Sequence, residues 1–227
     1  MSQLKIISWN IWGGKNLKGI ISCLKETSAD IIALQEVLED EDGQNNNAEE
    51  IAKELGYNWV FTNTKTLTPS ISYLLQKHNI NSNKHWGNAI LSKHPIIESS
   101  SYTLSENNSR TAVKITFEFQ DNKIDVFSTH LVHAAHSTEA RVEQVENLLK
   151  LLSDNSTIVA GDFNDVSESE TITKMKEKMK HSEDGFPTNK DKKIDYIFTT
   201  KNINITNSGV IKSEASDHLP IYAIIEF

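Results

Sequence analysis

Short runs of apolar residues alternate with amphipathic stretches along the first part of the chain. Residues 4–11, 30–37 and 57–62 are rich in strand-forming residues and predict three β-strands. In the two stretches between them, apolar residues recur at the spacing of an amphipathic helix: Leu17, Ile20, Ile21 and Leu24 in the first, and Ala48, Ile51, Ala52 and Leu55 in the second. Gly56 follows directly and predicts the end of the second helix.

The rest of the chain continues this alternation. Four successive strands are predicted at residues 88–92, 96–104, 112–119 and 123–129, with a turn at Asp121 and Asn122 between the last two. A short buried strand is predicted at residues 157–160, and closing strands at residues 194–199, 203–211 and 219–227. Two more helices are indicated by their apolar faces: Val142, Val145, Leu148, Leu149 and Leu152 in one, and Ile172, Met175 and Met179 in the other.

Residues 63–86 fit neither pattern, since they are mostly polar with one apolar cluster at residues 71–75. We interpret them as a long excursion, and long excursions are often functional. No linker, repeat or low-complexity tract divides the sequence, so residues 1–227 are expected to form a single domain. Many strands with intervening helices favour an α/β or α+β fold that has its sheets inside and its helices outside.

Composition narrows the class of protein. Hydrophobic residues make up 37% and charged residues 24% of the chain, which is typical of a folded globular protein rather than a disordered one. The net charge of −8 argues against a general electrostatic affinity for nucleic acid or an anionic membrane, because such binding depends on clustered Lys and Arg. A nucleic-acid partner stays open only through a local basic patch.

The sequence carries no signal peptide pattern at its start, and no run approaches the ~20 apolar residues that span a bilayer. Its one cysteine, Cys23, cannot form an internal disulfide, which favours a reducing compartment. We therefore expect a cytoplasmic protein with no membrane partner, acting as a monomer.

Polar motifs interrupt the apolar pattern where predicted strands begin or end. They are Trp9 with Asn10, Gln35 with Glu36, residues 129–131 (Thr-His-Leu), residues 161–164 (Gly-Asp-Phe-Asn), Asp195, and residues 216–220 (Ser-Asp-His-Leu-Pro). Polar groups at strand ends can converge on one rim of a sheet, where loops leave a cleft. The spacing of Asp162 and Asn164 predicts that an extended backbone points both side chains the same way.

These residue types suit the chemistry of a hard cation and a phosphate. Mg²⁺ prefers oxygen ligands, often one or two carboxylates plus substrate oxygens, and Glu36, Asp217 and Asn10 could supply such ligands. No Cys/His cluster offers a zinc site. A bound phosphate also needs a group that activates water and donors for the developing charge, and the remaining candidates have that chemistry: His130, Asp162, Asn164 and His218.

Each motif also has an ordinary structural interpretation. Asn10 could cap a turn, Glu36 could be a solvated carboxylate, and His130 could be a half-buried histidine with no catalytic role. The lysines from Lys174 to Lys180 are most simply the solvated side of a helix. By contrast, Lys190, Lys192 and Lys193 directly precede Asp195, so they are candidates for the edge of a cleft that attracts anions.

Taken in order, the motifs resemble those of the endonuclease/exonuclease/phosphatase family, from Trp9 and Asn10 to residues 216–218. Residues 87–92 (Gly-Asn-Ala-Ile-Leu-Ser) also resemble the family's mid-domain strand, and Arg110 stands where many members carry an arginine. The resemblance implies the DNase I-like fold, a four-layer α/β/β/α sandwich in which helices flank two packed β-sheets.

The resemblance also implies roles for particular residues. Mg²⁺ or Mn²⁺ would be bound by Glu36, with Asn10 and Asp217 nearby. Asp162 would orient or deprotonate the attacking water, Asn164 would hold a phosphate oxygen, and His130 would donate to the transition state. His218 would contact the scissile phosphate with its ring oriented by Asp195. The expected substrate contacts are Asn88, Arg110 and His133.

The family's substrates are diverse, and the sequence favours one branch only in part. The apurinic endonucleases of the family carry a Tyr where this chain has His130, whereas sphingomyelinases, deadenylases and tyrosyl-DNA phosphodiesterases share the Thr-His-Leu form. The first hypothesis is a divalent-metal-dependent hydrolase of a phosphate mono- or diester, acting on a small or single-stranded substrate. A nuclease or DNA-repair phosphodiesterase is the alternative within this chemistry. A catalytically silent binding module is the alternative of another class.

Overall fold

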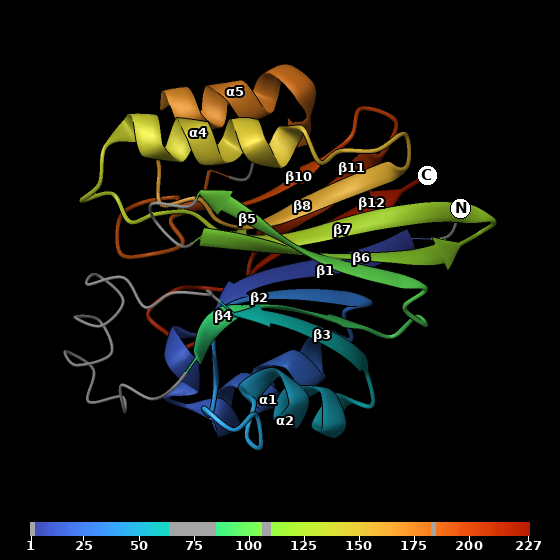
Figure 1. Ribbon diagram of the computed structural model, residues 1–227. Helices are drawn as coiled ribbons and strands as arrows, with labels where there is room; N and C mark the ends of the chain where they lie inside the picture. The colour runs from blue at the N-terminus through green and yellow to red at the C-terminus, as the bar shows by residue number, and fades with distance from the viewer. Residues whose placement is uncertain (1–2, 64–84, 106–109, 183–184) are drawn as a thin grey trace.

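Two β-sheets pack face to face between two layers of helices (Figure 1). The computed structural model describes residues 3–63, 85–105, 110–182 and 185–227. Within these residues each sheet has six strands. Helices α1 and α2 cover the outer face of one sheet, and α4 and α5 cover the outer face of the other. This arrangement confirms the expected α/β/β/α sandwich. No helix in the described part of the chain is long and apolar enough to cross a membrane.

The first sheet has the strand order β11-β12-β1-β2-β4-β3, in which only β1 and β2 pair in parallel. Its strands are β1 (Gln3–Asn10), β2 (Ile31–Glu39), β3 (Asn58–Asn63), β4 (His85–Ser92), β11 (Asn204–Val210) and β12 (Ile221–Glu226). A 3₁₀ turn, η1 (Trp12–Gly14), follows β1 and leads to α1 (Leu17–Thr27), and α2 (Asn47–Leu55) follows β2.

The second sheet has the order β5-β6-β7-β8-β10-β9, in which only β7 and β8 pair in parallel. Its strands are β5 (Glu98–Ser105), β6 (Arg110–Phe119), β7 (Asn122–His130), β8 (Ser156–Asp162), β9 (Lys180–His181) and β10 (Asp195–Thr199). The helices beside it are α4 (Thr138–Leu149) and α5 (Glu170–Lys178).

Local sequence fixes where the helices begin. Each α-helix in the described residues begins at a polar side chain that accepts a backbone N–H left without a partner by the first turn: Asn16 for α1, Asn46 for α2, Ser137 for α4 and Ser169 for α5. Gly56 ends α2 in the left-handed conformation, with φ of 73°, as the sequence predicted.

The apolar core is divided into three layers by the alternation of side chains along the strands. Ile6 on β1 and Ile158 on β8 point into the space between the sheets, whereas their neighbours Ile7 and Val159 pack against the helices. Because both faces of the central strands are covered, those strands read as nearly continuous apolar runs in the sequence.

The connectivity brings the polar motifs to one end of both sheets. Parallel strands β1 and β2 end at the same edge, and β12 runs antiparallel to β1, so residues 216–218 just before it lie there too. In the second sheet His130 pairs with Asp162 across β7 and β8, and Asp195 pairs with Asp162 across β10 and β8. The predicted convergence of strand ends is therefore present.

Several predicted boundaries were wrong. The β6–β7 turn consists of Gln120 and Asp121, both with positive φ, rather than Asp121 and Asn122, because Phe119 and Asn122 already pair across the strands. Asn63 belongs to β3, and His85 and Trp86 to β4, so they are not part of an excursion. The remainder of that predicted excursion, residues 64–84, lies outside the described residues.

The two late helices also differ from prediction. Helix α5 ends at Lys178, and Lys180 lies in β9, where it pairs with β10 instead of extending the helix. Helix α4 ends before Leu152, and Val142 is only half-buried. The fully covered face of α4 instead includes the polar residues Arg141 and Gln144, because they bind the loop beneath the helix.

Candidate active site

A cleft of about 270 Å³ lies at the end of the sheets where the strand ends converge. Most of the predicted site residues line it: Glu36, Arg110, His130, His133, Asp162, Asn164, Asp217 and His218. The other three, Asn10, Asn88 and Asp195, are buried and are not among the lining residues. The structure thus brings most of the predicted set together from both sheets.

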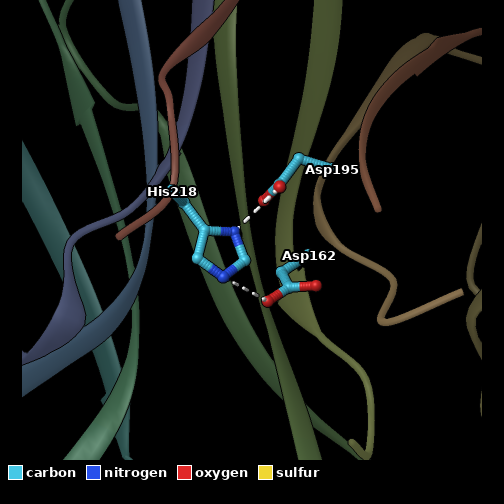
Figure 2. Close-up of side chains that lie close together, drawn as sticks. All are labelled: Asp162, Asp195 and His218. Carbon is cyan, nitrogen blue, oxygen red and sulfur yellow. Dashed lines mark hydrogen bonds and ion pairs between the residues drawn. The ribbon is translucent and has the colours of Figure 1, made fainter. Parts of the chain in front are cut away.

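The imidazole of His218 lies between two buried carboxylates (Figure 2). His218 Nδ1 is 2.9 Å from Asp195 Oδ2, a hydrogen-bond distance. On the other side of the ring, Nε2 is 3.8 Å from Asp162 Oδ2, an ion-pair distance too long for a direct hydrogen bond. Asp195 therefore orients the ring, while the Nε2 proton remains available to another acceptor.

Neighbouring carboxylates determine the protonation of His218. Burial by itself would lower the pKa of His218, but the carboxylates of Asp195, Asp162 and Glu36 raise it to about 10. A ring with this pKa carries a proton on both nitrogens at neutral pH, of which Nδ1–H donates to Asp195 and Nε2–H is left for another acceptor. Burial and the charge of Asp195 raise the pKa of Asp162, which the charge of His218 partly offsets.

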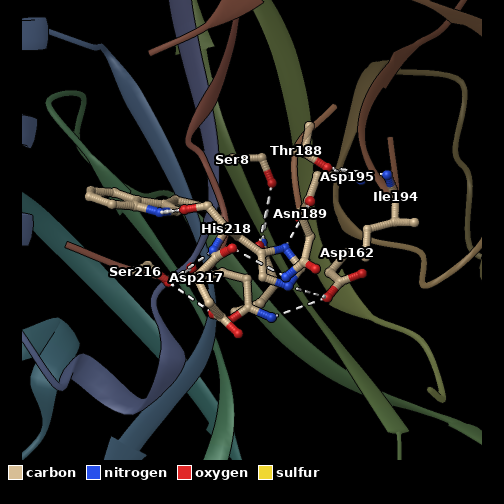
Figure 3. Close-up of polar contacts among 12 residues, drawn as sticks. Ser8, Asp162, Thr188, Asn189, Ile194, Asp195, Ser216, Asp217 and His218 are labelled. Carbon is tan, nitrogen blue, oxygen red and sulfur yellow. Dashed lines mark hydrogen bonds and ion pairs between the residues drawn. The ribbon is translucent and has the colours of Figure 1, made fainter. Parts of the chain in front are cut away.

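The loop that carries His218 is held by contacts with both sheets (Figure 3). Trp9 Nε1 donates to the carbonyl of His218 at 2.9 Å, and Ser216 Oγ donates to the carbonyl of Asn10 at 2.7 Å. Asn189 Nδ2 donates to the carbonyl of Asp217 at 3.2 Å. The loop is therefore fixed by the carbonyls of Asp217 and His218 and by the Ser216 hydroxyl, and the side chains of Asp217 and His218 line the cleft.

Glu36 reaches the cleft through a β-bulge in β2. Leu34 pairs with Ala89 and Val37 with Gly87, so two residues of β2 oppose one residue of β4. Glu36 has φ of 56°, in the left-handed region that a non-glycine residue occupies at a cost of about 1–2 kcal/mol. Bulges commonly redirect a side chain beside an active site, and this one places the carboxylate at the cleft.

The environment of Glu36 disfavours its charged form. The pKa of Glu36 is raised to about 7, with burial as the largest cause. The nearby charges of Asp217 and Asp162 also raise it, whereas hydrogen bonding by Asn10 and the charge of His218 lower it. A carboxylate among other carboxylates is stabilised by a bound cation, so this position suits a metal ligand.

Asn10 connects the carboxylates across the two sheets. Its Nδ2 donates to Asp162 Oδ2 at 3.1 Å, and its Oδ1 accepts the backbone N–H of Trp12 at 3.1 Å. In this arrangement Asn10 acts as a donor to the acidic side chains. Its expected role as a metal ligand therefore stays a prediction.

His130 and Asn164 form a second pair in the cleft. Asn164 Nδ2 donates to the carbonyl of Leu131 at 3.1 Å and lies 3.0 Å from His130 Nε2. Burial lowers the pKa of His130 well below its usual value, and the positive charges of Arg110 and His218 lower it further, so the ring is neutral. With Nε2 accepting from Asn164, the ring proton lies on Nδ1, which has no partner among the described residues.

The turn after β8 differs from the extended backbone predicted for it. Strand β8 ends at Asp162, and Asn164 has φ of 52°, with its backbone N–H donating to Asp162 Oδ1 at 2.9 Å. Both side chains still reach the cleft, but through this tight turn. Gly161 permits the approach of β7, because a Cβ there would run into the carbonyl oxygen of Thr129.

Arg110 and Asn88 occupy the β4–β6 side of the site. Arg110 begins β6 with its side chain buried, and no hydrogen bond or salt bridge holds it within the described residues. Burial lowers the pKa of Arg110, and the negative charges of Glu36 and Asp162 partly oppose that shift. Asn88 donates to the carbonyl of Thr111 at 2.9 Å, and its Oδ1 has no partner in the described chain.

The lysines near Asp195 are divided between two hollows. Lys190 lines the cleft, whereas Lys192 and Lys193 line a separate hollow of about 460 Å³ beside α5. Of the three predicted cleft lysines, the structure therefore places one in the cleft. Lys174 forms an outer ion pair with Glu146 at 2.6 Å, consistent with the solvated helix face expected for it.

The sequence analysis did not predict the polar face of α4, which binds the loops that follow β7 and β8. Arg141 Nε pairs with Asp165 Oδ2 at 2.8 Å, and its Nη1 donates to the carbonyls of His133 and His136. Gln144 Oε1 accepts the backbone N–H of Val132 at 3.0 Å. An Arg and a Gln three residues apart next to apolar Val145 would have been the sequence signal, since together they form one helix face.

Comparison with known proteins identifies the family of this chain and solved structures that share its fold. The model of the Endonuclease/Exonuclease/phosphatase family matches residues 7–218. An endonuclease/exonuclease/phosphatase from Beutenbergia cavernae has a TM-score of 0.83 at 18% identity, covering 100% of this chain and 72% of that one. The human nocturnin catalytic domain with bound sulfate has a TM-score of 0.83 at 20% identity, covering 99% and 93%.

A mannosyl-6-phosphatase from Bacteroides thetaiotaomicron has a TM-score of 0.74 at 18% identity, covering 99% of this chain and 100% of that one. The search of curated proteins gave no significant match. At these identities the solved structures show a common fold, and the family model shows the family.

Asp195→Asn is expected to lower the pKa of His218, because Asp195 is the largest charge that raises it. A pKa raised on folding from about 6.5 contributes stability below pH 6.5, and that stability is lost as pH rises through about 10. In EDTA, the variant should therefore lose less unfolding free energy between pH 6.5 and 10 than the parent. NMR titration of His218 and urea unfolding measure both effects. The exposed-site control Asp154→Asn should behave as the parent, and an unchanged His218 pKa in Asp195→Asn would contradict the prediction.

Arg141→Leu is expected to destabilise the fold by about 3 kcal/mol, because it leaves the largely buried Asp165 carboxylate without its ion-pair partner and with only Thr171 and Val166 donating to it. Urea unfolding measures this loss. Arg141→Lys keeps the charge but not the forked geometry, so it should recover only part of it. The control Lys174→Leu breaks an exposed ion pair and should cost no more than about 1 kcal/mol. Equal losses for Arg141→Leu and Lys174→Leu would show that the buried pair has no special role.

Proposed function

Because the chain belongs to the endonuclease/exonuclease/phosphatase family, whose members are hydrolytic phosphoesterases, we propose that it is a divalent-metal-dependent phosphoesterase. It hydrolyses a phosphate mono- or diester by in-line attack of an activated water. The observation that carries the proposal is the convergence in one cleft of the acidic pair Glu36 and Asp162, the imidazolium of His218 and the guanidinium of Arg110. These groups supply cation binding, proton transfer and anion stabilisation in one place.

The residues fit a hard divalent cation better at Glu36 than at the nearby acidic cluster. Asp162, Asp195 and His218 have ligand atoms within 4.8 Å of one another. However, His218 directs both ring nitrogens at carboxylates: Nδ1 lies 2.9 Å from Asp195 Oδ2 and Nε2 lies 3.8 Å from Asp162 Oδ2. Glu36 and Asp217 both line the cleft and offer carboxylate oxygens, the ligands that Mg²⁺ and Mn²⁺ prefer.

Glu36 and Asp217 would hold the ion, with Asn10 beside them. Mg²⁺ or Mn²⁺ bound there would act as a Lewis acid for the phosphate group and offset the local negative charge. This assignment accounts for the strained backbone at Glu36, because the bulge places its carboxylate at the cleft. It is also consistent with the raised pKa of Glu36, which follows first from burial and then from the neighbouring charges of Asp217 and Asp162.

The phosphate is bound by donors that this chain already directs into the cleft. The Arg110 guanidinium has no protein carboxylate within salt-bridge distance in the described chain, so a phosphate oxygen supplies its partner. His218 Nε2 can donate to a second phosphate oxygen because its separation from Asp162 is too long for a hydrogen bond. The Asn164 amide is positioned to donate to a third once it turns from His130.

Asp162 would take a proton from the attacking water. The pKa of Asp162 is raised towards neutral pH, and a general base works best when its pKa lies near the operating pH. Asn10 and the backbone N–H of Asn164 hold its two oxygens in place. His130 is neutral in this structure, and it can donate to the developing charge if its proton moves to Nε2 when Asn164 releases it.

The second candidate is a nuclease or DNA-repair phosphodiesterase. The family match allows it, since the family's name covers endonucleases and exonucleases as well as phosphatases, and one structural neighbour is a mannosyl-6-phosphatase. We favour a compact or single-stranded ester, because the chain carries a net charge of −8 and, among the described residues, Arg110 and Lys190 are the only basic groups besides the histidines that line the cleft. A long duplex would need basic groups along many phosphates.

Glu36→Gln should abolish most activity, because it removes the charge that binds the cation while preserving size. We expect turnover of bis-p-nitrophenyl phosphate to fall at least about 100-fold, and calorimetry to show weaker Mn²⁺ binding. EDTA should abolish activity in the parent, and Mg²⁺ or Mn²⁺ should restore it. Glu50→Gln, on an exposed part of α2, is the matched control and should leave both unchanged. Turnover that persists in EDTA after dialysis would exclude the mechanism, and no turnover of any ester would favour a binding module.

Compact esters should be better substrates than duplex DNA, and their kcat/KM should change little between low and physiological salt. Each neutralised phosphate on a duplex would add about 0.9 to the slope of log affinity against log salt. Cleavage rates of a plain duplex, an abasic duplex, a single strand and p-nitrophenyl phosphate at two salt concentrations test this. Fast duplex cleavage with a steep salt dependence would favour the nuclease hypothesis instead.

A further inference from the structure

Backbone strain is concentrated around the cleft. Among the described non-glycine residues with positive φ, Ser28 ends α1, and Gln120 and Asp121 form the β6–β7 turn. The other four all line the cleft: Trp12, Glu36, Asn164 and Lys190. Strained residues persist where the surrounding structure holds them, and they cluster at functional sites. Glu36 and Asn164 already have proposed roles, which leaves Trp12 as the bulkiest residue without one.

The strained turn that presents Trp12 is fixed on both sides. Trp12 has φ of 50°, and its backbone N–H donates to Asn10 Oδ1 at 3.1 Å. Asn47 Nδ2 donates to the carbonyl of Gly13 at 2.9 Å, which ties the turn to the start of α2. The Lys15 ammonium lies 3.5 Å from the centroid of the Trp12 ring, a cation–π contact that holds the indole. The half-buried ring is therefore placed at the cleft before any substrate binds.

A second tryptophan borders the same side of the cleft from another strand. Trp86 lies on β4 and lines the cleft, and it is 3% exposed. In the sheet, β2 lies between β1 and β4, so Glu36 on β2 is flanked by the turn of Trp12 after β1 and by Trp86 on β4. Two indoles thus border the carboxylate that is proposed to hold the cation.

The remaining lining of the cleft makes these rings distinctive. Apart from Trp12 and Trp86, Ile194 is the only apolar side chain that lines it in the described chain. The charged and amide groups suit the phosphate, whereas two indoles suit an apolar, planar group next to it. We propose that Trp12 forms a recognition surface for a planar aromatic ring carried by the phosphate ester and is the specificity-determining residue, whereas Trp86, at 3% exposed, only borders that surface.

This inference rests on the proposed function and narrows its substrate class. An aromatic ring can come from a nucleobase or from an aryl group such as a phenol, and stacking on indole is tolerant of which ring is offered. A lipid ester is a poorer fit, since acyl chains need a wide apolar surface. The large apolar residues that are exposed in the described chain, Ile97, Val166 and Phe186, are not among those that line the cleft.

Inhibition constants for ligands that share a phosphate but differ in the ring test the proposal. The probes are adenosine 5′-monophosphate, phenyl phosphate, ribose 5-phosphate and inorganic phosphate, each competing with bis-p-nitrophenyl phosphate in Mg²⁺. Stacking predicts that at least one ring-bearing ligand binds about tenfold more tightly than ribose 5-phosphate. Trp12→Leu should remove this preference without weakening inorganic phosphate, and Trp12→Phe should retain part of it.

Trp59→Leu is the matched control, since Trp59 is a half-buried tryptophan on β3 that does not line the cleft. It should keep the full preference for the ring. Tighter binding of adenosine 5′-monophosphate than of phenyl phosphate identifies a nucleobase as the ring, and the reverse order identifies an aryl group. Equal affinity for ribose 5-phosphate and both ring-bearing ligands, or a preference that survives Trp12→Leu, would overturn the proposal.

An NMR readout separates this outcome from failure of the proposed function. The protein has four tryptophans, so ¹⁵N-indole labelling gives resonances that single substitutions assign. Adenosine 5′-monophosphate or phenyl phosphate should shift the Trp12 and Trp86 signals and leave Trp59 unchanged, whether or not any ester is hydrolysed. Ring-dependent shifts without turnover would support the recognition surface and reject the hydrolase. Turnover without such shifts would reject the recognition surface alone.

Discussion

The buried imidazolium of His218 is the interaction on which the candidate site depends. Asp195 and Asp162 are each 1% exposed, and two neighbouring carboxylates cannot both stay charged there without compensation. His218 lies between them and gains a pKa of about 10 in return, so the three groups stabilise one another. The loop around His218 and the ends of β8 and β10 must therefore meet in register. Removing His218 would leave the two buried carboxylates without the positive charge that lies between them, which is a costly change.

The polar end of the sandwich is held by contacts that cross between the sheets. Asn10 at the end of β1 binds Asp162 at the end of β8, and Gln35 on β2 donates to Ser128 on β7 at 3.1 Å. Elsewhere the sheets are joined by aliphatic packing, which is strong but does not direct one side chain toward another. The directional contacts are thus placed where geometry matters, at the cleft.

Strained backbone at the cleft is held in place by buried contacts with helix α4. Glu36 and Asn164 reach it through left-handed backbone, and the turn of Asn164 continues into Asp165, which Arg141 on α4 holds at 2.8 Å. The same arginine binds the loop that carries His133. Such buried contacts explain how unfavourable local conformations persist, because relaxing them would break interactions formed elsewhere. They also connect the helix layer to the chemistry proposed for the cleft.

The sequence by itself indicated most strands and helices in their order and most of the site residues that line the cleft, and its family resemblance implied the layered fold. Alternating and helical spacing reveal burial locally, and the motifs at strand ends carry chemistry in their residue types. Only the tertiary structure decided the bulge at Glu36, the turn at Asn164, the Arg141–Asp165 pair, and the placement of Trp12 and Trp86 around β2. The reason is sequence separation. Asn10 and Asp162 are 152 residues apart and Trp9 and His218 are 209 apart, so folding alone sets their distances, charges and pKa values.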